Sequence, residues 1–184
     1  MDLLNRSTIF LFVSLTVGLF TVSQSQPSLD DAQLKALNSR IHEYTEDFRK
    51  SDWAKLYDLV SKTGKGDASR EVFETAMKRM HGKEYGELQD LLEFKFHHAV
   101  ATKPGEYDIY GCGKIMKYGW KYDGIVEIHA VQENNDWYFT GWRPTAFPAE
   151  LCKSLNDSKW KPYTHDNWDK PMEEIRKYEE TKKQ

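Results

Sequence analysis

Two titratable residues, Glu127 and His129, lie two positions apart in a segment with the alternating pattern of a β-strand. Side chains two positions apart in a strand point to the same face, so this spacing can place a carboxylate beside an imidazole. Such a pair can supply a general base and its hydrogen-bonding partner. His98, on an earlier strand, is a third candidate; alternation places it on the apolar face with Phe94 and Phe96, as a hydrogen-bonded core histidine or a pocket residue. Exposed strand faces often carry the same residue types, so the sequence favours a solvated or structurally satisfied pair over a catalytic one.

Metal, cofactor and nucleic-acid binding are not expected. His97 and His98 are adjacent, so in a regular strand they point to opposite faces and cannot both ligate one ion. No His-x-x-x-His or His-Glu-x-x-His arrangement is present. Gly111-Cys112-Gly113-Lys114 lacks the full spacing of a phosphate-binding loop. The 26 Lys and Arg against 29 Asp and Glu give a net charge of −3, which excludes a strongly basic nucleic-acid binder.

The first 25 residues have the pattern of a secretory signal peptide, which predicts a secreted, extracellular protein. Arg6 gives the positive start, an apolar stretch runs from Ile9 to Val22, and Ser23 and Ser25 are small residues before the expected cleavage. This stretch is shorter than the roughly 20 residues that span a bilayer, although an uncleaved signal anchor stays an alternative. After cleavage no membrane contact is expected.

The secreted location determines how Cys112 and Cys152, the two cysteines of the chain, are interpreted. In an oxidising compartment they are the only possible intramolecular disulfide pair; two buried thiols or a bond to another chain are the alternatives. The same location gives meaning to the sequon Asn156-Asp157-Ser158, which is glycosylated only on an exposed loop. We therefore expect a Cys112–Cys152 bond and treat Asn156 as a candidate glycosylation site.

The elements that must position these residues are predicted by hydrophobic periodicity. Helical spacing predicts helices over about 34–48, 53–60 and 69–81, with a loop over 62–67. Alternation predicts strands over about 92–101, 107–121, 125–132 and 137–142, with turns at Lys103-Pro104-Gly105, Asp123-Gly124 and Asn134-Asn135-Asp136. Glycines inside the second strand are typical of bulges or bends. Helices followed by antiparallel strands indicate an α+β fold in which N-terminal helices pack on a curved sheet.

The last part of the chain, 143–184, is predicted to be an irregular extension with a short helix from Asp169. A bond between Cys152 and Cys112 would hold this extension against the second strand, where it closes one end of the sheet or covers an edge. Aromatic residues concentrate in the last three strands. Many of them are expected to pack the sheet against the helices, but an aromatic-lined pocket for an apolar ligand is also predicted, formed by Tyr110, Tyr138 and Trp142.

Several motifs resemble the nuclear transport factor 2-like superfamily, whose members have SnoaL-like or cystatin-like cones. Residues 46–59 (EDFRKSDWAKLYDL) are similar to its first-helix exit and second-helix start, and 69–73 (SREVF) to its third-helix start. Residues 123–131, followed by 135–139, are similar to its closing strand pair. The resemblance covers about residues 30–142. It implies a bent sheet around a long helix, with a pocket at the open end that serves binding in some members and lyase or isomerase chemistry in others.

These observations predict a signal peptide over 1–25, an α+β domain over 26–142 and an extension over 143–184 packed on it. The expected function is the binding of a small apolar ligand, or of an extracellular protein, by a secreted and non-enzymatic protein. Two alternatives stay open. One is a secreted lyase or isomerase that uses the histidine or glutamate candidates inside the cone. The other is a structural module that forms homodimers, as many members of the superfamily do.

Overall fold

The computed structural model describes residues 29–81, 90–117, 120–146 and 149–163, together with 173, 176 and 180. The expected signal peptide lies outside these residues. So does most of the helix expected from Asp169, of which Glu173, Arg176 and Glu180 are helical and exposed. In the described part, no helix has the length and apolar composition needed to cross a membrane.

Four helices form the first half of the described chain: α1 Asp31–Lys50, α2 Trp53–Leu59, α3 Lys62–Lys65 and α4 Arg70–His81. Capping side chains set their limits. The Asp30 carboxylate accepts a hydrogen bond from the Gln33 amide at the start of α1. The short helix α3 corrects the loop expected over 62–67. It forms because the Ser61 hydroxyl accepts a hydrogen bond from the Gly64 amide and caps one helical turn.

The second half is a four-stranded antiparallel sheet, with the strands side by side in chain order: β1 Asp90–Lys103, β2 Glu106–Lys117, β3 Trp120–Glu133 and β4 Asp136–Ala146. The turn expected at Asp123-Gly124 is wrong. These residues lie inside β3, where Gly124 pairs with Gly113. The β2–β3 ladder is continuous from Lys117 and Trp120 onward, so the pairing of two long strands overrides the local turn preference of Asp-Gly.

The last strand is longer than the sequence predicts. β4 continues beyond Trp142, so residues 143–146, expected to be irregular, extend the ladder with β3. Pro144 lies in this part, where it is tolerated because β4 is an edge strand of the sheet. A 3₁₀ helix, η1 Ala149–Asn156, then takes the place of another segment that was expected to be irregular.

A β-bulge in β1 changes which face of the sheet carries the histidines. Phe96 pairs with Gly111 and His98 with Tyr110, so His97 is an extra residue in the ladder. One extra residue turns the later side chains to the other face. Phe96 packs on the core beneath α1, whereas His98 contacts η1 on the opposite face. The expectation that His98 shares the apolar face with the phenylalanines before it is therefore wrong. The two histidine rings also lie only 6.5 Å apart and do not point to opposite faces.

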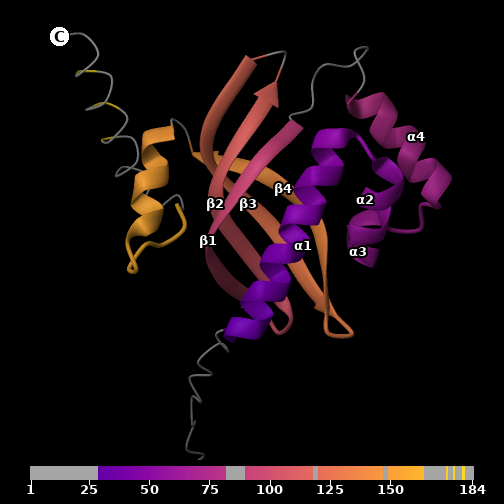
Figure 1. Cartoon of the computed structure of the whole chain (residues 1–184), viewed down its shortest axis with the longest axis horizontal. Helices are drawn as coiled ribbons and strands as arrows, with labels where there is room; N and C mark the ends of the chain where they lie inside the picture. Colours follow the sequence, from indigo (N-terminus) through magenta and orange to yellow (C-terminus); the bar gives the residue numbers. More distant parts are fainter. Residues whose placement is uncertain are drawn as a thin grey trace, which may run out of the picture.

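The main core lies between α1 and the sheet. Leu37 and Ile41 of α1 are buried against Ile109, Ile128 and Phe139 of three strands. Figure 1 shows α1 lying along the curved strands, with α2, α3 and α4 beside its C-terminal half. The apolar faces of the helices and of the strands therefore meet in one layer, which confirms the expected α+β architecture of helices packed on an antiparallel sheet.

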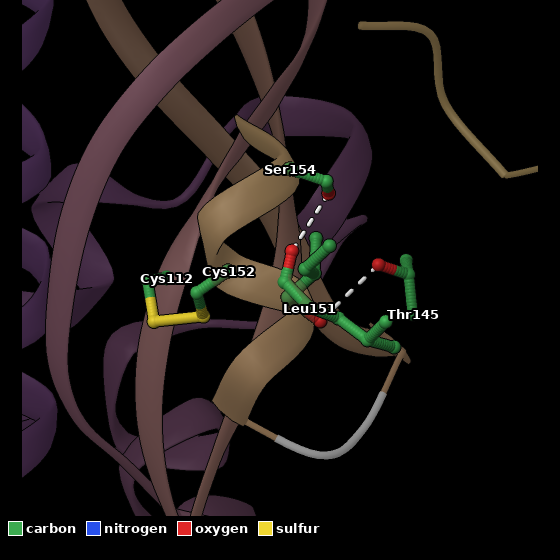
Figure 2. Close-up of a disulfide and its surroundings, with 6 residues drawn as sticks. Cys112, Thr145, Leu151, Cys152 and Ser154 are labelled. Carbon is green, nitrogen blue, oxygen red and sulfur yellow. Dashed lines mark hydrogen bonds between the residues drawn. A yellow bond between two sulfur atoms is a disulfide. The ribbon is translucent and has the colours of Figure 1, made fainter. Parts of the chain in front are cut away.

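A second cluster lies on the other face of the sheet, which we call the outer face. Leu151 and Leu155 of η1 are buried there with Tyr110 and Ile125. The Cys112–Cys152 disulfide, with 5.5 Å between the two Cα atoms, links η1 to β2 (Figure 2) and confirms the expected pairing. Because its leucines pack on the strands, η1 covers the outer face of the sheet and not the edge or end that we expected.

Candidate functional site

A pocket of about 620 Å³ lies between the helices and the edge strand β4. Its wall is largely apolar and includes Tyr44, Phe48, Leu56, Phe73, Met77 and Trp142. The pocket is open to one side, where residues of α4 form its rim. Met77 is buried, whereas Val72 and Met80 also line the pocket but stay 59% and 40% exposed. The site is therefore an apolar cleft with an uncovered rim.

A histidine, His81, also lines this pocket. His81 is the last residue of α4, and its Nδ1 lies 2.6 Å from a carboxylate oxygen of Asp90, the first residue of β1. The His81 side chain is only 6% exposed. Phe48 and Trp53 pack against its ring, with centroids 5.1 and 5.0 Å away. The end of a helix and the start of a strand thus place a histidine–carboxylate pair at an apolar cavity.

Sequence reasoning missed both members of this pair. The available signal is the spacing of Phe73, Met77 and His81, which are four residues apart and therefore share one helical face. A histidine in the last turn of a helix is usually explained by its favourable interaction with the helix dipole. No sequence pattern links His81 to Asp90, because their contact depends on how α4 and β1 converge.

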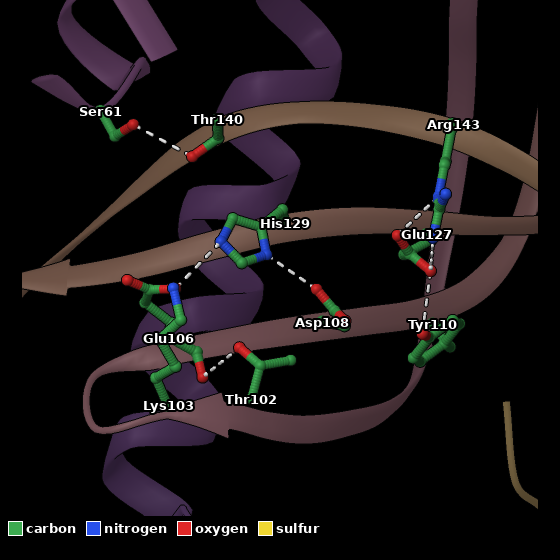
Figure 3. A network of polar contacts seen from close by, with 10 residues as sticks. All are labelled: Ser61, Thr102, Lys103, Glu106, Asp108, Tyr110, Glu127, His129, Thr140 and Arg143. Atoms are coloured by element: carbon green, nitrogen blue, oxygen red, sulfur yellow. Dashed lines mark hydrogen bonds and ion pairs between the residues drawn. The ribbon is translucent and has the colours of Figure 1, made fainter. Parts of the chain in front are cut away.

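Glu127 and His129 lie on the outer face, away from α1 (Figure 3). Glu127 accepts hydrogen bonds from the Tyr110 hydroxyl at 2.8 Å and from Nε of Arg143 at 2.7 Å. Nδ1 of His129 lies 2.7 Å from a carboxylate oxygen of Asp108. The two residues share a face, as their spacing predicts, but each has its own partners and they lie outside the apolar pocket.

The surroundings of Glu127 keep this carboxylate paired. Burial raises the pKa of the Tyr110 hydroxyl, and the hydrogen bond to Glu127 raises it further. The same carboxylate raises the pKa of Arg143. Tyr110 is thus a neutral donor and Arg143 a cation, both directed at Glu127. The groove beside them has a volume of about 180 Å³, below the range of roughly 300–1,000 Å³ typical of ligand pockets. The network joins β2, β3 and β4.

His98 is held on the outer face by η1. Its Nε2 lies 2.6 Å from the carbonyl oxygen of Leu155, so this nitrogen donates a hydrogen bond. The ring stacks on Trp160 with 5.1 Å between centroids. Burial lowers the pKa of the neighbouring His97, and Lys95 lowers it further. The contacts of His98 link β1 to the C-terminal segment.

The three aromatic residues predicted to bind a ligand lie in different places. Trp142 lines the 620 Å³ pocket. Tyr110 is buried on the outer face beside η1, and Tyr138 pairs with Val131 near the β3–β4 turn. The structure therefore brings one of the three to the pocket and keeps the other two away from it.

Two further features concern metals and glycosylation. Within the described ranges, no group of three or more His, Cys, Asp or Glu side chains is arranged to hold a metal ion. Asn156 is exposed at the end of η1. The geometric condition for glycosylation of its sequon is met, and its occupancy stays a prediction.

No family model matches the chain, and no curated protein does. Solved structures with similar folds include an NTF-2 like protein of unknown function from Shewanella oneidensis (10% identity, TM-score 0.42, 58% of this chain and 93% of that one). A domain of unknown function with a cystatin-like fold from Nostoc punctiforme has 9% identity and a TM-score of 0.46, over 83% of this chain and 99% of that one. An NTF2-like protein with a cystatin-like fold from Novosphingobium aromaticivorans has 10% identity and a TM-score of 0.42, over 68% and 90%. The site is therefore interpreted from its own geometry.

Proposed function

We propose that this protein is a secreted binding protein that holds a small apolar molecule in the pocket between α4 and β4. The observation that carries the proposal is the pocket itself. Its volume of about 620 Å³ falls within the range of ligand sites, and its wall is mostly aliphatic and aromatic. The Cys112–Cys152 bond supports an oxidising compartment, in agreement with the signal peptide predicted from the sequence.

Titration of the purified protein with a neutral fluorescent probe, N-phenyl-1-naphthylamine, tests this proposal. The probe should bind and gain fluorescence in wild type. Ala76 lines the pocket and is exposed, so Ala76→Phe adds a ring there without overpacking the core. We expect it to weaken binding about tenfold, which corresponds to about 1.4 kcal/mol. Ala36→Phe, on the exposed side of α1, is the matched control. No binding of the probe, or equal loss in both variants, contradicts the proposal.

Two other roles predicted from the sequence stand beside ligand binding. An extracellular protein partner would bind to the exposed rim formed by Val72 and Met80. Homodimerisation would double the mass of the protein in solution. Among the described residues, neither role has a surface as clearly formed as the pocket. Small-molecule binding is therefore the function that the geometry supports best.

The second candidate function is acid/base catalysis in the same pocket, and the His81–Asp90 pair is the observation that favours it. A histidine oriented by a carboxylate can abstract a proton from a bound molecule. A deuterated ketone, 4-hexylacetophenone labelled on its methyl group, provides a test. Nε2 would accept a deuteron while the C–D electron pair forms the enolate, and exchange with water would return hydrogen. Loss of deuterium that is faster than in buffer and absent in His81→Phe supports catalysis; equal rates oppose it.

A further inference from the structure

The charged side chains that line the pocket are occupied by partners elsewhere. Nζ of Lys65 donates a hydrogen bond to the Tyr57 carbonyl at 3.2 Å and lies 4.3 Å from the centre of the Tyr57 ring. Arg143 donates to Glu127 on the outer face. No Asp or Glu is among the described residues that line the pocket. A ligand in the pocket therefore meets no carboxylate directly and finds both cations already engaged.

Three polar side-chain atoms of the lining have no hydrogen-bond partner among the described residues: the Tyr44 hydroxyl, Nε1 of Trp142 and Nε2 of His81. Tyr44 is 2% exposed, and burial alone raises the pKa of its hydroxyl, which therefore remains a neutral donor. Thr140, another polar side chain of the lining, has a partner in the Ser61 hydroxyl, 3.1 Å away. The few polar atoms of a mostly apolar pocket fix the orientation of a bound molecule, so these atoms are the available partners for a polar group of a ligand.

The contact with Asp90 determines what His81 offers to the pocket. A carboxylate can only accept a hydrogen bond, so the hydrogen lies on Nδ1 of His81, 2.6 Å from the Asp90 oxygen. A ring that carries its hydrogen on Nδ1 alone presents a lone pair at Nε2 to a ligand. Trp53 and Phe48 pack against the ring, and the side chain is 94% buried, since 6% is exposed. The complementary ligand group is therefore a hydrogen-bond donor.

We propose that the ligand of this pocket is an apolar molecule with a single acidic hydroxyl group, of the phenol, enol or carboxylic acid class, which donates to Nε2 of His81. This inference rests on the proposed binding function and names the ligand chemistry of the same site. Asp90 strengthens the acceptor, because its negative charge stabilises positive charge that develops on the imidazole. His81 is thus the residue that determines specificity, and Asp90 is a positioning residue that sets its tautomer.

Three matched ligands, 4-hexylphenol, 4-hexylanisole and hexylbenzene, distinguish the contribution of the hydroxyl hydrogen to the affinity from that of the apolar part of the molecule. Their dissociation constants are measured by displacement of N-phenyl-1-naphthylamine. We expect wild type to bind the phenol at least about tenfold more tightly than the anisole, because the methyl ether leaves Nε2 unpaired. In His81→Phe the two constants should become equal. His42→Phe, on the exposed side of α1, should keep the wild-type ratio.

Asp90→Asn provides a second variant that retains the histidine. An amide can donate to Nδ1, which moves the ring hydrogen to Nε2 and removes the acceptor. The preference for the phenol over the anisole should therefore fall towards one. Equal affinities of the phenol and the anisole for wild type would overturn the inference and leave the proposed function intact. Failure of all three ligands and of the probe to bind would refute the proposed function itself.

Discussion

Removal of the Cys112–Cys152 disulfide should destabilise the protein by an amount that follows from the length of the loop it closes. The two cysteines are 40 residues apart. In the chain-entropy model, a loop of this length lowers the entropy of the unfolded chain enough to contribute about 4 kcal/mol at 25 °C. Replacement of both residues, Cys112→Ser with Cys152→Ser, leaves Leu151 and Leu155 packed on the outer face. The double variant should therefore fold, with its free energy of unfolding reduced by about that amount.

Urea unfolding followed by tryptophan fluorescence measures this loss in three samples: the oxidised wild type, the reduced wild type and the double variant. We expect the last two to agree. In thermal unfolding of the same samples, their melting temperatures should lie roughly 8–16 °C below that of the oxidised protein, at about 2–4 °C per kcal/mol for a chain of this size. A loss below about 1 kcal/mol would refute the chain-entropy reasoning. It would show that the unfolded chain without the bond retains structure that already limits the separation of the two cysteines.

Four further predictions concern packing, acid stability, modification and assembly. A Cβ on Gly111 would lie 2.2 Å from a backbone oxygen, so Gly111→Ala should cost about 1–3 kcal/mol in urea unfolding, whereas Gly141→Ala, with nothing within 4 Å of its Cβ, should be neutral; equal effects would contradict this. The Arg40 guanidinium lowers the pKa of Asp136 from its ordinary value of 3.8. The pair therefore adds stability at higher pH that is lost as the pH falls through the lowered pKa, so in Asp136→Asn the free energy of unfolding should fall less as the pH is lowered through this range. Expression through a secretory pathway should add a glycan at exposed Asn156, seen as a mass that Asn156→Gln lacks. Light scattering tests the predicted homodimer, which a single monomer mass at micromolar concentration would rule out.

The fold was largely predictable because long periodic segments dominate it. The helical spacing of α1 and the alternation of β1 and β3 each involve enough residues to override local exceptions. One error lies where a single residue decides the outcome. His97 is a single insertion in the β1 ladder, and it moves His98 to the other face. Such a bulge has no pattern of its own in one sequence, because it depends on the pairing with β2.

The candidate site was less predictable than the fold, and for a different reason. Glu127 and His129 were found by their spacing within one strand, a local property that periodicity reveals. His81 and Asp90 belong to two elements, and their contact is a property of packing. Trp142 could be placed near a pocket from the general concentration of aromatic residues. The structure is needed to show that Trp142 lines the wall, whereas Tyr110 lies on the outer face with η1.

The chain order of the strands also determines when the disulfide can form during folding. Each strand pairs with its neighbour in sequence, so the sheet can assemble through successive hairpins with short loop closures. Cys112 lies in β2 and Cys152 follows β4, so β3 and β4 lie between them. On this folding route, the two sulfur atoms meet after both strands have added to the sheet and η1 has docked. Oxidation is then expected late, and the bond closes a sheet that is already complete.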